Sequence, residues 1–208
     1  MDTIALASSK GGCGKSTLAI HLATMLQISG KDVLLVDMDH HSRTVTEWAS
    51  ERDLELPSVI RADALDIQEL LKQASSEAFD VVILDLPPYV SEKITVVTEF
   101  STLTLVPCRP SFADIRTLPR VLDQIRGKKH VVLNACHPTP AKSTKIKELF
   151  ALLAENDISC CPFAISQRVA FSDALNDGES VFECDEKSKA SREVSDVLGW
   201  VLENIQKY

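Results

Sequence analysis

A short segment near the N-terminus carries side chains suited to binding phosphate groups. Lys10–Thr17 reads KGGCGKST, with three glycines, two lysines and two hydroxyl side chains. Glycine lets a backbone wrap closely around an anion with its N–H groups pointing inward. In such a loop Lys15 is expected to reach the outer phosphates of a nucleotide, and the Ser16 hydroxyl to ligate Mg²⁺. The alternative is a glycine-rich turn that binds nothing.

The elements around this loop follow the rhythm of an α/β protein. Short, wholly apolar runs predict buried strands at Thr3–Ala7, Val33–Val36, Val59–Ile60, Val81–Leu84, Leu103–Val106, Val131–Leu133 and Ile158–Phe163. Helical spacing predicts helices at Ser16–Ile28, Thr44–Ser50, Ile67–Ala74, Leu118–Ile125 and Ile146–Leu153, and a last one from Val194 to Ile205. Strands that are apolar throughout are typical of a sheet covered on both faces. The alternation predicts a doubly wound fold, with a mostly parallel sheet and helices on both faces.

Length and composition limit the classes of protein that remain. The chain has 208 residues, a formal net charge of −8 and an ordinary share of apolar residues, which suits a single globular domain. The acidic balance excludes a whole-protein attraction to nucleic acid, so DNA binding would need a local basic patch. No apolar run approaches the roughly 20 residues of a membrane span, and no secretory signal is visible. Six cysteines without a C-x-x-C pair indicate free thiols in a reducing cytoplasm.

Four polar residues lie at or just beyond the ends of predicted strands. They are Lys10, Asp37, Asp85 and Asn134. Ligands of open α/β sheets bind outside the carboxyl ends of the strands, so these residues are expected to gather around one site. Each of them, taken alone, is also compatible with capping a helix or forming a turn.

The loop itself resembles that of a known family. Ser9 stands where the ordinary G-x-x-x-x-G-K-[ST] pattern has glycine, and Lys10 adds a second lysine. The resulting K-G-G-x-G-K-[ST] resembles the deviant Walker A motif of the ParA/MinD superfamily of ATPases. The resemblance implies that Lys10 reaches across an ATP-dependent sandwich homodimer to the partner's phosphates, acting in catalysis with Lys15. It implies ATP binding by Gly11, Gly12, Cys13, Gly14, Lys15, Ser16 and Thr17.

Further motifs match the same family in the same order. Val33–Asp39 (VLLVDMD) resembles its second acidic motif, which makes Asp39 the candidate for orienting the attacking water and a candidate Mg²⁺ ligand. Val81–Pro88 (VVILDLPP) resembles Walker B, which implies that Asp85 holds Mg²⁺ through a water. Asn134 resembles the residue that contacts the adenine base. The family usually has Pro-Gln after the D-x-D, where this chain has His40-His41.

The resemblance extends from residue 3 to about residue 205. Leu105–Pro107 with Pro110, Ser111 and Asp114, and the stretch 167–183, are similar to the small ParF-like ParA proteins of plasmid partition. This implies one ATPase domain over 1–208 without an N-terminal DNA-binding extension. It also implies a nucleoid-associated, cytoplasmic protein that binds DNA non-specifically as an ATP dimer. Its expected partner is a ParB-type centromere-binding adaptor.

Basic residues supply candidates for the DNA contact. Arg168, Lys187, Lys189 and Arg192 form a basic group near the C-terminus. By resemblance, Lys189 and Arg192 lie where relatives present cations to DNA, and Arg168 is nearby. A second basic run lies between Arg126 and Lys147, with the solvated face of a helix as the alternative for any one residue. The C-terminal apolar stripe is expected to pack into the core rather than bind a membrane as in MinD. A chromosomal cargo-positioning ATPase and a metabolic ATP-dependent enzyme on the same fold remain alternatives.

Overall fold

A parallel sheet forms the centre of the molecule. The computed structural model describes residues 1–88, 92–138 and 143–205. These residues form a six-stranded sheet in the order β3-β2-β4-β1-β5-β6, with every pairing parallel. The strands are β1 (Asp2–Leu6), β2 (Val33–Asp37), β3 (Ser58–Arg61), β4 (Val81–Asp85), β5 (Leu103–Cys108) and β6 (Lys129–Leu133).

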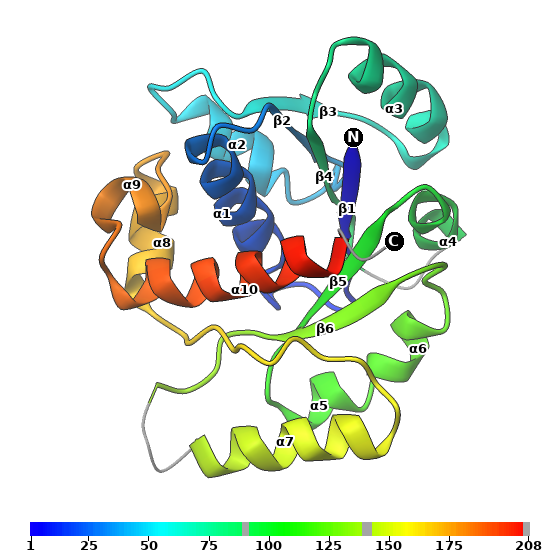
Figure 1. Ribbon diagram of the computed structural model, residues 1–208, viewed down its shortest axis with the longest axis vertical. Coiled ribbons are helices and arrows are strands. Elements are labelled where there is room, and N and C mark those ends of the chain that lie inside the picture. Colours follow the sequence, from blue (N-terminus) through cyan, green and yellow to red (C-terminus); the bar gives the residue numbers. More distant parts are fainter. Residues whose placement is uncertain (89–91, 139–142, 206–208) are drawn as a thin grey trace.

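Helices cover both faces of the sheet (Figure 1). One face packs against α1 (Lys15–Ile28), α2 (Thr44–Ser50), α8 (Val169–Asn176), α9 (Val181–Asp185) and α10 (Lys189–Ile205). The other packs against the short 3-10 helix η1 (Ala64–Asp66), α3 (Ile67–Ser76), α4 (Glu92–Glu99), α5 (Phe112–Ile115), α6 (Leu118–Leu122) and α7 (Ser143–Glu155). The predicted doubly wound α/β fold is confirmed.

The central strands are apolar throughout because their side chains pack alternately into the hydrophobic cores on the two faces of the sheet. In β1, Ile4 and Leu6 pack beneath α1 and α10, whereas Ala5 packs on the opposite face. All three side chains are fully buried. Successive side chains of a strand point to opposite faces, so a strand between two helical layers must be apolar at every position.

One predicted strand was wrong. The stretch 158–163 makes only an isolated bridge to β6, through Val131 N–H to Ser159 O at 2.9 Å and Cys161 N–H to Val131 O at 2.8 Å. A regular parallel ladder would next join Phe163 N–H to Leu133 O, but Ile165 N–H donates to Leu133 O instead, at 2.9 Å, so the regular pairing stops after one bridge. The apolar run is buried as predicted at Cys161, but its backbone does not extend the sheet.

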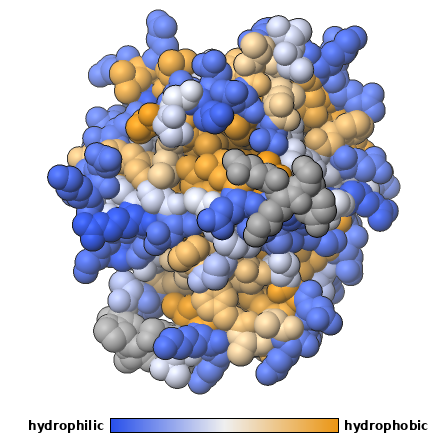
Figure 2. Space-filling view, viewed as in Figure 1, coloured by the Kyte–Doolittle hydropathy of each residue, from blue (hydrophilic) through white to orange (hydrophobic). Residues whose placement is uncertain are grey.

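The C-terminal helix packs into the core, as predicted. Its apolar stripe is buried, and consists of Val194, Val197, Leu198, Val201 and Ile205. Figure 2 shows a hydrophilic band across the middle of the molecule, where Figure 1 places the outer face of α10. Within the described ranges, no helix is long and apolar enough to pass through a bilayer.

Candidate functional site

The glycine-rich loop connects β1 to α1 at the carboxyl edge of the sheet. Gly12 and Gly14 have φ values of +74° and +84°, a region that favours glycine. Gly14 also has no room for a side chain, because a Cβ there would lie 2.2 Å from Asn134 Nδ2. The loop borders a cavity of about 190 Å³, whose lining consists of Lys10–Thr17, Asp39, Ser42, Thr44 and Pro88. The predicted loop residues therefore line one cavity, and their binding of phosphate stays a prediction.

Lys15 and Asp85 meet beneath this loop. Lys15 is the first residue of α1 and Asp85 the last of β4, and Lys15 Nζ donates a 2.8 Å hydrogen bond to Asp85 Oδ1. Both side chains are buried. Burial raises the pKa of Asp85, and the Lys15 ammonium and the Ser16 hydroxyl oppose that rise. The ammonium and the carboxylate thus stand together where β1 and β4 end side by side.

The residues around Asp85 fit a bound Mg²⁺. The second oxygen of Asp85, Oδ2, is buried and has no hydrogen-bond partner among the described residues. A buried carboxylate oxygen without a partner is costly, and a hydrated Mg²⁺ would satisfy it. The Ser16 hydroxyl is close enough to lower the pKa of Asp85 by hydrogen bonding. A hydroxyl and a carboxylate, both suitable Mg²⁺ ligands, therefore lie next to each other.

Asp39 lies in the loop that follows β2. It accepts hydrogen bonds from His41 N at 3.1 Å, from Ser42 N at 3.2 Å and from Ser42 Oγ at 2.8 Å. Burial raises the pKa of Asp39, but the hydrogen bonds from Ser42 and His41 outweigh it, and the pKa lies below its ordinary value. Asp39 is therefore ionised at neutral pH and acts as an acceptor on the wall of the phosphate cavity.

The two histidines after Asp39 fasten this loop on its outer side. His40 Nδ1 lies 3.0 Å from Arg61 Nη2, and His40 Nε2 lies 3.5 Å from Asp63 Oδ2. His41 contributes its backbone N–H to Asp39, while its side chain is exposed. His40 thus holds the loop by contacts with β3 and the segment after it, whereas His41 contributes only its backbone hydrogen bond within the loop.

Lys10 makes its contacts within its own chain. Its ammonium donates to Ala113 O at 2.9 Å and to Asp114 Oδ1 at 3.4 Å, and 41% of its side chain is exposed. Asp114 is held in turn by Ser111, which caps α5. Ser111 and Asp114 belong to a motif visible in the sequence, but the contact between Asp114 and Lys10 joins residues 104 positions apart and was missed.

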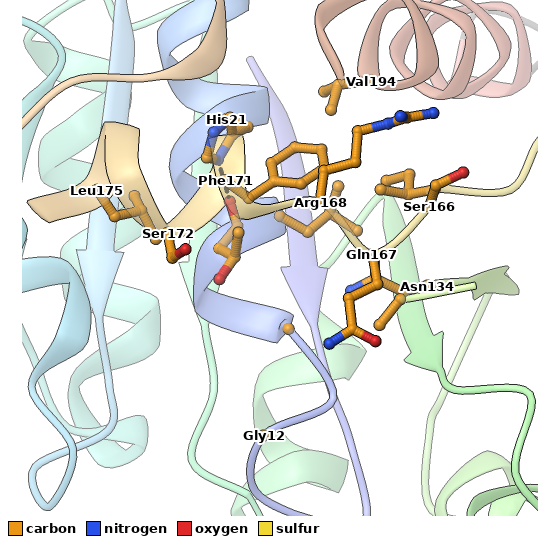
Figure 3. A pocket seen from close by; sticks show the side chains of 15 residues that line it. Gly12, His21, Asn134, Ser166, Gln167, Arg168, Phe171, Ser172, Leu175 and Val194 are labelled. Carbon is orange, nitrogen blue, oxygen red and sulfur yellow. Dashed lines mark hydrogen bonds between the residues drawn. The ribbon is translucent and has the colours of Figure 1, made fainter. Parts of the chain in front are cut away.

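A second cavity, of about 410 Å³, adjoins the loop at Gly12 and Gly14 (Figure 3). Asn134 lines it and donates from Nδ2 to Cys13 O at 2.8 Å, which ties the end of β6 to the loop. Gln167 and Arg168 line the cavity from the segment that leads into α8, and Phe171 lines it from α8 itself. Its size, its apolar wall and its place next to the phosphate cradle suit a nucleoside. Asn134 thus lines a cavity beside the loop, and its contact with a base stays a prediction.

His21 was missed by the sequence reasoning. It lies one turn after Thr17 on α1, is fully buried, and packs edge-on against Phe171 with ring centroids 5.1 Å apart. His21 Nδ1 lies 2.7 Å from Thr17 O, and since a carbonyl only accepts, Nδ1 carries the proton. Burial lowers the pKa of His21 to about 4. A histidine in an apolar helical stripe gives no signal of this kind in sequence.

The DNA-contact candidates occupy two different environments. Lys187, Lys189 and Arg192 are exposed at and just before the start of α10. Arg168 instead lines the larger cavity and pairs with Glu193 at 2.5 Å. This placement gives Arg168 a candidate role beside the nucleoside as well as at DNA.

The second basic run is partly engaged in the fold. Lys128 Nζ donates to Asn204 O on α10, and Lys129 Nζ donates to Leu122 O at 2.6 Å and to Ile125 O at 2.9 Å. These lysines satisfy backbone carbonyls at or beyond helix ends, as cations commonly do. The predicted position at Lys142 lies outside the described residues.

Comparisons with known proteins identify the family of this chain. The family model described as "CobQ/CobB/MinD/ParA nucleotide binding domain" matches residues 4–181. The maintenance of carboxysome distribution protein A of Halothiobacillus neapolitanus is 27% identical over 96% of this chain and 96% of its own length. Protein ParA of Rhizobium radiobacter is 28% identical, over 83% of this chain and 81% of that protein.

Solved structures share the architecture. MinD in the MinC:MinD cell division protein complex of Aquifex aeolicus superposes with a TM-score of 0.79 at 20% identity, covering 98% of this chain and 96% of that one. MinD of Pyrococcus horikoshii, complexed with Mg-ADP, superposes with a TM-score of 0.75 at 15% identity, covering 100% and 99%. The family match over most of its length and the loop geometry lead to one conclusion: this chain belongs to the CobQ/CobB/MinD/ParA family of nucleotide-binding proteins.

Proposed function

We propose that this protein is a partition ATPase, which uses ATP binding and hydrolysis to distribute a cargo over DNA. ATP-bound protomers form a sandwich homodimer that binds DNA without regard to sequence. An adaptor of the ParB type, bound to the cargo, stimulates hydrolysis and releases the dimer from DNA. The observation that carries the proposal is the pair of lysines around the loop, with Lys15 buried against Asp85 and Lys10 half-exposed at its rim.

The residues of the cradle divide the chemistry among themselves. Gly11–Thr17 would bind the phosphates through backbone N–H groups, and Lys15 would add its charge once the phosphates compete for it with Asp85. Ser16, and Asp85 through a water, would hold Mg²⁺, which supplies further charge neutralisation to the phosphates. Asp39 would orient the attacking water, whose oxygen bonds to the γ-phosphorus as the bond to ADP breaks.

The position of Lys10 supports a reaction that depends on dimerisation. In a single chain its ammonium is held by Ala113 and Asp114. To neutralise phosphates bound by another protomer it must leave these acceptors, which favours doing so only when a second copy offers a stronger anion. A lone protomer would therefore hydrolyse ATP slowly.

DNA binding is assigned to the cations near α10, with Arg168 as a further candidate. Lys187, Lys189 and Arg192 are exposed and lie close together in sequence. The chain as a whole carries a net charge of −8, so attraction to DNA phosphates has to come from such a local group. Two protomers in one dimer would double the number of contacts, which supports binding that requires ATP.

A second candidate concerns the nature of the cargo. A relative of nearly equal length is named as a carboxysome distribution protein. This name supports a cargo such as a carboxysome in place of a plasmid or chromosome. A MinD-like positioning ATPase would instead recruit its dimers to a membrane. A metabolic enzyme on this fold would respond to a small molecule rather than to DNA.

One experiment separates these functions. DNA retardation and size-exclusion mass are measured without nucleotide, with ADP and with a slowly hydrolysed ATP analogue. The proposal expects dimers and retarded DNA with the analogue alone. Tight DNA binding by the nucleotide-free monomer, or dimers that sediment with anionic liposomes and ignore DNA, would contradict it.

A further inference from the structure

Arg109 lies against the glycine-rich loop, although no motif of the sequence marks it. The strands β1 and β5 are neighbours in the sheet, with Leu6 paired to Leu105, so the segments that leave them emerge side by side. Arg109 is the first residue after β5. A Cβ built on Gly12 would lie 2.8 Å from Arg109 Nη2 and 3.9 Å from its Cζ, so the guanidinium touches the loop where Gly12 has no side chain.

The charge of Arg109 is not neutralised as the charges of the two lysines are. Lys15 pairs with Asp85 at 2.8 Å and Lys10 with Asp114 at 3.4 Å. Over the described ranges of the chain, no carboxylate forms an ion pair with Arg109. A guanidinium stays charged at any physiological pH. An acidic protein therefore holds a solvated cation, without an ion-pair partner among the described residues, against its glycine-rich loop, where it is free to bind an anion.

Arg109 lies outside the two cavities of its own chain that border the glycine-rich loop. Its side chain is exposed and lines neither the phosphate cavity nor the larger cavity beside it. The segment 109–114 also carries Ala113 and Asp114, which hold Lys10. Phe112, which lies between Arg109 and Ala113 in this segment, is 80% exposed. Lys10, Arg109 and the ring of Phe112 thus form one short exposed surface. Arginine and aromatic side chains are common among the residues that contribute most to protein–protein binding.

We propose that Arg109 is a third phosphate-directed cation of this protein, which binds the triphosphate of the nucleotide held by a second copy of the chain. This inference rests on the proposed ATP-dependent dimer and adds to it a residue that acts between protomers. The planar guanidinium can give two parallel N–H hydrogen bonds to phosphate oxygens, which a lysine cannot. Phe112 would be covered by the same approach of the second copy.

The test compares Arg109→Ala and Arg109→Lys with Arg120→Ala, a matched loss of one exposed arginine on α6. Sedimentation velocity measures the dimerisation constant with a slowly hydrolysed ATP analogue. Binding of a fluorescent ADP analogue to dilute monomer is measured beside it, and thermal melting checks folding. Hydrogen bonds to a charged group are worth about 1.5–3 kcal/mol, and a symmetric dimer loses two such contacts, so Arg109→Ala should weaken the dimer roughly a hundred- to ten-thousandfold. Arg109→Lys should be intermediate, and ADP binding should stay within twofold of the unmodified chain.

Two results would overturn the inference while leaving the proposed function intact. One is an Arg109→Ala protein that dimerises with ATP analogue as tightly as Arg120→Ala. The other is equal loss of ADP binding by the monomer, which would assign the guanidinium to the nucleotide of its own chain. Failure of the unmodified chain to bind nucleotide or to dimerise would instead contradict the proposed function itself.

Discussion

The ammonium of Lys15 donates a 2.8 Å hydrogen bond to Asp85 Oδ1, and the side chains are only 6% and 1% exposed. Two motifs that are 70 residues apart in sequence thus meet in one buried ion pair. Both members of the pair are groups proposed to engage ATP and Mg²⁺. A change in this contact is therefore expected to affect both folding stability and nucleotide binding.

Replacing Lys15 should affect both properties. Lys15→Ala leaves the Asp85 carboxylate buried without its partner, and breaking a buried pair costs about 3–5 kcal/mol of the free energy of unfolding. ATP binding and dimerisation should be lost as well. Urea denaturation and nucleotide titration measure the two effects, with exposed Lys72→Ala as the control. Unchanged unfolding in Lys15→Ala would show that the pair contributes nothing to stability.

Replacing Asp39 should separate hydrolysis from dimerisation. Asp39→Ala removes the acceptor proposed to orient the attacking water, while Lys15 and the glycines of the cradle remain in place. ATP-dependent dimers should form and persist, and single-turnover hydrolysis should slow by about 10²–10⁴-fold. Normal turnover in this variant would remove Asp39 from the role assigned to it.

Adding one methyl group at Gly14 should disable the loop. Its φ of +84° and the 2.2 Å approach of a Cβ to Asn134 Nδ2 mean that Gly14→Ala is strained and displaces Asn134. Stability should fall by about 1–3 kcal/mol, together with nucleotide affinity. The matched control is Gly199→Ala on α10, where a Cβ meets nothing within 4 Å, and which should gain about 0.5–1 kcal/mol. Chemical denaturation of both variants decides the comparison.

His21 should make stability depend on pH in mildly acidic solution. Burial lowers the pKa of His21 from 6.5 to about 4, so the unfolded chain binds the extra proton between these values and the folded chain does not. The free energy of unfolding should therefore decrease as pH falls from 6.5 to 4, by roughly 3 kcal/mol from this residue. His21→Asn should have a shallower slope than the unmodified chain in urea titrations across this range. Equal slopes would contradict the prediction.

The cations near α10 should control the salt dependence of DNA binding. Each phosphate contact contributes about 0.9 to the slope of log affinity against log salt concentration. Lys189→Ala and Arg192→Ala should each reduce that slope by about one, or by two if both protomers of a dimer contribute. Lys72→Ala on α3 should not change it. Slopes that both Lys189→Ala and Arg192→Ala leave unchanged would place the DNA contact elsewhere.

Much of this protein was determined by local sequence. Wholly apolar strands and helical spacing predict the doubly wound fold, because a strand between two helical layers must be apolar at every position. The glycines, Lys15 and Ser16 are predicted because backbone geometry and phosphate chemistry together accept few other residues. The stretch 158–163 was assigned to the wrong element, since an apolar run is buried equally well without a ladder, and the helices α4, α8 and α9 were not predicted.

Only the tertiary structure decided which of these residues touch. Lys10 rests on Asp114, Arg109 stands against Gly12, and Arg168 pairs with Glu193 beside the nucleoside cavity. None of these contacts is encoded by spacing, because each joins segments whose proximity is set by strand order and by the packing of helices on the sheet. The sequence determines which reactive side chains are present, and the order of strands in the sheet determines which of them lie close enough to act together.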